Sequence, residues 1–106
     1  MIDAIVIGEI IEQYRKHGWT LRRALLSESG NREVVERLAS IEVTQSDFDA
    51  LWFSRKSRPE SEAWELRRLS GSPFALVAVI ASDVTDHERE RALSEVVDKM
   101  RAKTFA

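Results

Sequence analysis

The segment 74–81 constrains the fold of this chain more than any other. It reads Phe-Ala-Leu-Val-Ala-Val-Ile-Ala, without a polar side chain, and follows a turn signal at 70–73. Its β-branched and aromatic composition predicts a strand. A strand of an antiparallel sheet with one face in water would alternate apolar and polar residues, so both faces of this one require cover. We expect it inside a sheet or paired across a dimer, because at a free edge it would favour aggregation.

The N-terminal segment carries a similar apolar surplus. Residues 2–17 place apolar side chains at helical spacing, and Ile7 and Ile11 widen that stripe. Such a helix is normally buried on more than one side. Gly18 marks its expected end, since glycine accepts the left-handed conformation that follows many helices.

Two more helices are predicted. Residues 86–103 give the clearer one, because Thr85 and Glu88 have capping-box spacing and an apolar stripe follows. A short helix is expected at 32–39. Residues 40–49 fit either a short strand or a helical turn.

Three strands join 74–81 in a predicted four-stranded, mainly antiparallel sheet; they lie at about 19–26, 50–55 and 63–69. Short polar loops make the last three strands of the sheet a meander. Residues 47–55 also match helical spacing, which leaves a helix as the alternative there. The result is an α+β fold, one domain spanning 1–106, with the helices on one face of the sheet.

This arrangement leaves the second face of 74–81 bare. A second copy of the chain would cover it, and a two-fold dimer is the commonest oligomer. We assign Ile7, Ile11, Val77 and Val79 to such a self-association surface. If the helices divide between the two faces of the sheet, the strand would instead be covered in a monomer.

Each of the three tryptophans is followed by arginine. Trp19 opens Trp-Thr-Leu-Arg-Arg, Trp64 opens Trp-Glu-Leu-Arg-Arg, and Trp52 precedes Arg55 by three residues. On amphipathic strands we expect the tryptophans in the core and the arginines in polar cross-strand pairs. The alternative is an open face that binds a protein or stacks nucleic-acid bases. The candidate binding residues are Trp19, Arg22, Arg23, Trp52, Arg55, Trp64, Arg67 and Arg68.

Charge and motif content limit the available chemistry. The 16 Lys and Arg against 18 Asp and Glu give a net charge of −2, so the basic excess typical of nucleic-acid binders is missing. Without cysteine, thiolate catalysis and iron–sulfur clusters are excluded. We find no phosphate loop, dinucleotide fingerprint or hydrolase motif. Asp83, Asp86, His87 and Glu90 could surround a divalent ion, but this group fits an acid-rich helix start better than a metal site. We assign no catalytic, cofactor or metal residue.

These observations predict a small protein that acts without catalysis, as a self-association or protein-interaction module. The absence of cysteine favours the cytoplasm, and we expect neither a signal peptide nor a membrane span. A homodimer without a cofactor is expected. Single-stranded nucleic-acid or RNA binding is the alternative, and a small enzyme of unknown reaction comes third.

Overall fold

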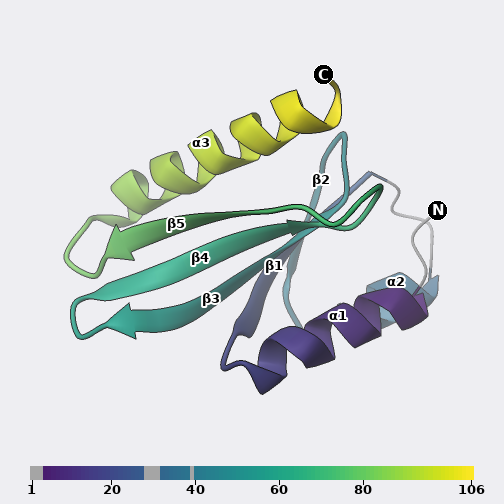
Figure 1. Ribbon diagram of the computed structural model, residues 1–106, viewed down its shortest axis with the longest axis horizontal. Helices are drawn as coiled ribbons and strands as arrows, with labels where there is room; N and C mark the ends of the chain where they lie inside the picture. The colour runs from purple at the N-terminus through teal and green to yellow at the C-terminus, as the bar shows by residue number, and fades with distance from the viewer. Residues whose placement is uncertain (1–3, 28–31, 39) are drawn as a thin grey trace.

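The structure is a computed structural model that describes residues 4–27, 32–38 and 40–106. Helices near both ends of the chain flank one sheet, so the expected α+β fold is confirmed (Figure 1). In chain order the elements are α1 (Ala4–Lys16), β1 (Thr20–Leu26), α2 (Arg32–Arg37), β2 (Glu42–Gln45), β3 (Ala50–Arg58), β4 (Ser61–Arg68), β5 (Ala75–Ala81) and α3 (Asp86–Thr104). None of the helices within these described ranges is long and apolar enough to cross a membrane.

The sheet has five strands in the order β2-β1-β3-β4-β5. Strands β3, β4 and β5 form the predicted antiparallel meander, and β1 adds to it antiparallel beside β3. Strand β2 pairs parallel with β1 after the crossover through α2, which makes the sheet mixed. The prediction of four strands is therefore wrong, because β2 adds a fifth. The strand that was one of the two alternatives for residues 40–49 is present as β2, with all four of its residues exposed. The alternative of a helix at 47–55 is wrong, because β3 occupies most of that segment.

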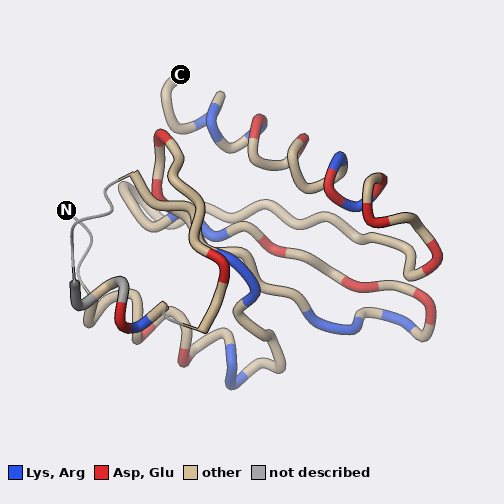
Figure 2. Tube along the Cα trace, turned by 180° about the vertical axis from the view of Figure 1, so that it is seen from behind, with Lys and Arg blue, Asp and Glu red and all other residues tan. Residues whose placement is uncertain are grey.

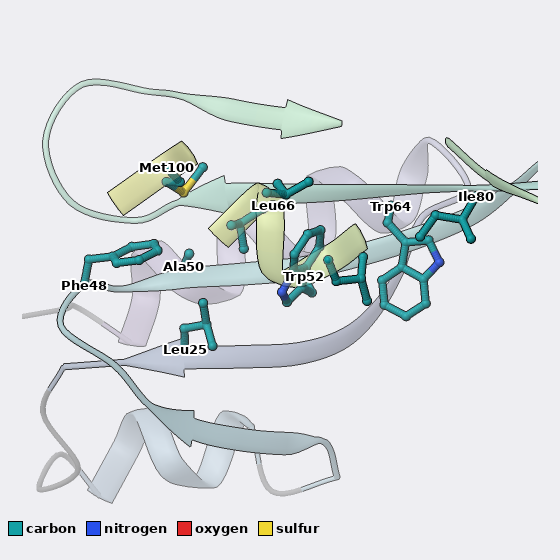
Figure 3. Close-up of a cluster of buried hydrophobic side chains, with 10 residues drawn as sticks. Leu25, Phe48, Ala50, Trp52, Trp64, Leu66, Ile80 and Met100 are labelled. Carbon is teal, nitrogen blue, oxygen red and sulfur yellow. The ribbon is translucent and has the colours of Figure 1, made fainter. Parts of the chain in front are cut away.

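Helix α3 covers one face of the sheet. Its apolar stripe, with Leu93 and Met100, packs on Trp52, Trp64 and Leu66 (Figure 3). The predicted cap is present, since the Thr85 side chain accepts a hydrogen bond from the Glu88 backbone N–H at 3.1 Å. This cluster forms the larger part of the core.

Helices α1 and α2 cover the opposite face, over β1 and β3. Ile7 and Leu38 pack there on Leu26, Leu51 and Phe53. The expectation that the helices share one face is therefore wrong. Strands β1 and β3 bury side chains on both faces, Ala50 to Ser54 being buried without a break, so each face needs its own helical cover.

Strand β5 lies at the edge of the sheet, not inside it. It ends the meander, and the chain then continues into α3, which packs on one face of β5 only. Figure 1 shows α1 and α2 gathered at the β1 side of the sheet, away from β5. Val77 and Val79 remain 54% and 64% exposed on the other face of β5. The helices do divide between the two faces of the sheet, but the described part of the chain leaves the second face of β5 uncovered, so the expectation that such a division would cover the strand is wrong.

Candidate interaction surface

One half of the sheet surface opposite α3 lacks helical cover among the described residues. We call it the open face; it belongs to β4 and β5. Trp64, Leu66 and Ile80 point toward α3, so the residues that alternate with them point the other way. The register places Val79 beside Ala63 and Val77 beside Glu65. The open face comprises Glu65, Arg67, Ala75, Val77, Val79 and Ala81, and Ala63, which points the same way, is itself buried.

The charged groups of the open face are held by contacts within the chain. Glu65 accepts a hydrogen bond from the hydroxyl of Tyr14 on α1, and Arg67 donates to the backbone carbonyl of Arg68. The Tyr14 ring stacks on Phe53, with centroids 4.0 Å apart. Burial, and then the hydrogen bond to Glu65, raises the pKa of Tyr14 above its ordinary value of 10.0. What the open face offers a partner is therefore mainly the apolar surface of β5.

The outer edge of β5 offers unpaired backbone groups. Arg68 N–H donates to the Phe74 carbonyl at 2.9 Å, and Ser82 N–H donates to the Glu60 carbonyl at 2.8 Å. Because hydrogen bonding alternates along an antiparallel pair, Leu76, Ala78 and Ile80 direct their backbone groups toward β4. Ala75, Val77 and Val79 direct theirs away from it. No strand in the described part of the chain lies on that side.

The tryptophans do not form a ligand platform. Trp52 and Trp64 are 2% and 1% exposed, and their rings meet edge to face at 6.0 Å in the core beneath α3. The prediction of Trp52 and Trp64 as binding residues is therefore wrong, because α3 and the sheet enclose both rings. Trp19 lies on the opposite face, half-buried, 6.0 Å from Tyr14 and with the Arg55 guanidinium 4.6 Å from its ring centroid.

A β-bulge explains where two of the predicted arginines lie. The register of β1 against β3 shifts between Leu21 and Arg23. Strict alternation would send Arg22 and Arg23 to opposite faces, whereas both lie over the Trp64 ring, at 4.7 and 5.5 Å from its centroid. Arg22 also donates to Ser54 Oγ at 3.0 Å.

The other predicted arginines lie elsewhere and also make contacts within the chain. Arg55 donates to the His17 carbonyl at 3.1 Å, and Arg68 donates to the Ser72 carbonyl at 2.9 Å. With Arg67 held on the open face, the eight predicted binding residues are spread over both faces of the sheet. They do not form one site.

The predicted self-association residues divide into two pairs. Val77 and Val79 are exposed, as a contact surface requires, but Ile7 is fully buried at 0% exposure and Ile11 is partly buried in the same cluster. Ile7 is therefore wrong as a surface residue, because α1 turns it onto the sheet. The exposed apolar surface of α1 lies instead at Ile5, on the side of the helix away from the core. Sequence spacing did not reveal which side of so apolar a helix the sheet would cover.

Neither metal-ligating side chains in the described residues nor similarity to known proteins indicates a function. Within the described ranges, no three side chains of His, Asp or Glu gather closely enough to hold a metal ion. Comparisons of the chain with protein-family models, with curated proteins and with solved structures find no significant match.

Proposed function

We propose that this chain is a non-enzymatic self-association module that forms a homodimer through β5. The observation that carries the proposal is the exposure of Val77 and Val79, 54% and 64%, on an edge strand. Figure 2 displays β5 as an uncharged stretch beside charged positions on β4 and α3. Natural edge strands usually carry a charge, a proline or a bulge that prevents pairing. Strand β5 has neither a charged residue nor a proline between 75 and 81.

The valines alone are too little to hold a dimer. Each is about half covered already, so its complete burial would add about 1 kcal/mol. Two copies bring four such side chains, or about 4 kcal/mol, which only matches the lowest estimates of the entropic cost of association. The dimer therefore needs a second contribution, and the unpaired backbone of β5 offers one.

A foreign protein is the other candidate occupant of β5, and single-stranded nucleic acid is less well supported. The base-stacking hypothesis needed tryptophans on an open sheet, and Trp52 and Trp64 are core residues. We place the self-association in the cytoplasm, as the cysteine-free composition suggests.

Light scattering after gel filtration tests the proposal. We expect about 24 kDa, twice the 12.1 kDa of one chain, at micromolar concentration. The double variant Val77→Lys, Val79→Lys should run as a folded monomer, because it places four like charges in one small interface. The matched control is Val43→Lys on β2, also an exposed valine on an edge strand, and it should leave the dimer intact. A wild-type mass near 12 kDa at all concentrations would overturn the proposal.

A further inference from the structure

We infer that two copies of this chain pair their β5 strands edge to edge and antiparallel, about a two-fold axis between the two Ala78 residues. The inference rests on the proposed self-association and specifies its geometry. The occupant of the β5 edge is thus a second copy. Since each chain contributes five strands, the product is one continuous sheet of ten.

The sequence of β5 is nearly symmetric about its centre. Residues 75–81 read Ala-Leu-Val-Ala-Val-Ile-Ala, so Val77 mirrors Val79, and Leu76 mirrors its isomer Ile80. A two-fold axis through Ala78 therefore places every residue opposite one of the same or equal size. Cross-strand pairs of β-branched residues stabilise antiparallel sheets. A foreign strand would need no such symmetry, which favours a second copy.

The same register satisfies the free backbone. Val77 would lie opposite the partner's Val79, and both direct their N–H and C=O groups outward. Such a pair exchanges two hydrogen bonds, and the two-fold axis repeats them. Ala78 would then face the partner's Ala78 as a non-hydrogen-bonded pair, consistent with its own groups being directed to β4. Shifting the register by two residues would shorten the overlap and break the size match.

The other edge of the sheet does not offer the same contact. Strand β2 is four residues long and begins with Glu42, whose carboxylate lies 3.3 Å from Arg23 Nε. A short, charged strand is a poor template for pairing. The seven uncharged residues of β5 are the better one.

The charges of α3 suit this axis. Glu90 and Arg101 reach toward β1 and Asp47, so the opposite side of α3 faces the β5 edge. That side carries Glu95 at the middle of the helix and Lys99 about one turn later, both exposed. The two-fold axis sets the two α3 helices antiparallel on the same face, so Glu95 and Lys99 of one helix run opposite in order to those of the other and the unlike charges are directed toward each other.

A proline variant separates edge pairing from packing of the open faces. Val79 directs its N–H outward, so Val79→Pro removes no hydrogen bond to β4, and proline is tolerated on the outer side of an edge strand. Edge pairing predicts that Val79→Pro keeps the circular dichroism of the wild type but loses the dimer, at least a tenfold rise in dissociation constant. A dimer of unchanged affinity would overturn the inference while leaving self-association standing.

Cross-linking tests the axis without depending on the proline variant. The chain has no cysteine, so Ala78→Cys introduces a single thiol. In a non-hydrogen-bonded pair the two Cα atoms lie about 4.5 Å apart, within the range that a disulfide spans. Mild oxidation should therefore give a covalent dimer. Val77→Cys is the matched control: it lies diagonal to its own copy, beyond disulfide reach, and should cross-link only when mixed with Val79→Cys.

The outcomes are distinct. Efficient cross-linking of Ala78→Cys, with little from Val77→Cys alone, supports the axis. If the wild type is dimeric but Val77→Cys cross-links to itself and Ala78→Cys does not, the copies pack through their open faces and the inference fails. If the wild type is monomeric, the proposed function fails as well.

Discussion

The guanidinium of Arg23 on β1 holds the carboxylate of Glu90 on α3 through two parallel hydrogen bonds. The Nη1–Oε1 and Nη2–Oε2 distances are 2.9 and 2.7 Å. The pair joins elements 67 residues apart and ties α3 to the sheet above Trp64. Arg23, a candidate binding residue in the sequence analysis, thus makes a structural contact within the chain.

Loss of this ion pair should cost little stability, and the cost should depend on pH. The Arg23 guanidinium lowers the pKa of Glu90 below its ordinary value of 4.5. The Glu90 side chain is 49% exposed, so we expect Glu90→Gln to lower the free energy of unfolding by less than about 1 kcal/mol at neutral pH. A folded pKa below the unfolded one gives stability that is complete above the unfolded pKa and is lost as pH falls through the folded pKa.

Urea unfolding of wild type and Glu90→Gln at pH 7 and about pH 3 checks this prediction, because the difference should shrink at the lower pH. Glu9→Gln, which changes an exposed glutamate on α1, serves as control. Equal effects of the two variants would show that the ion pair contributes nothing.

Tyr14 should not ionise at an ordinary pH in the folded protein. Burial raises its pKa above 10.0, and the hydrogen bond to Glu65 adds to the shift. It is the only tyrosine of the chain, so absorbance at the tyrosinate band reports this residue alone. The stabilisation is complete below the unfolded pKa and is lost as pH rises toward the folded one. Tyr14→Phe should cost about 1 kcal/mol at neutral pH. A tyrosinate signal near pH 10 from the folded chain would refute the burial.

Tryptophan emission should be that of buried rings. Trp52 and Trp64 are enclosed, so the spectrum should be shifted to the blue and should move to the red on unfolding. Single-stranded oligonucleotides of mixed sequence should leave it unchanged. A strong quench that weakens with added salt would instead favour nucleic-acid binding.

Two glycines should respond oppositely to replacement by alanine. Gly18 has a φ of +85°, so Gly18→Ala should cost about 1 kcal/mol through left-handed strain. Gly8 lies inside α1, where an added Cβ would meet the flexible end of Arg37. Since that side chain can shift, Gly8→Ala should be neutral or stabilise the fold by up to about 1 kcal/mol. Thermal unfolding of both variants measures the difference. The same loss at both positions would contradict the backbone explanation.

The elements with strong local signals were predictable. The Thr85 cap, the stripe of α3 and the meander follow from short-range pattern, and the structure has them all. Strand β2 was predictable only as one of two alternatives for residues 40–49. Its pairing with β1 was not predictable, because it depends on the crossover through α2 and not on the exposed residues of β2.

The candidate site was predictable only at Val77 and Val79. The two Trp-x-Leu-Arg-Arg segments look equivalent, yet Trp64 lies beneath α3, whereas Trp19 precedes β1 and lies beside α1. The bulge at Arg22 and the placement of α1 arise from long-range packing, which sequence spacing does not encode. The edge position of β5 likewise depends on which strands pair.

Residue-resolved hydrogen exchange of the wild-type chain tests the pairing of β5 most directly. In a single chain the amides of Leu76 and Ala78 bond to β4, whereas those of Val77 and Val79 face outward. Pairing of two β5 strands predicts that the Val77 and Val79 amides are protected as well, and that dilution below the dissociation constant removes their protection alone. Rapid exchange of Val77 and Val79 at every concentration, with Leu76 and Ala78 still protected, would contradict edge pairing.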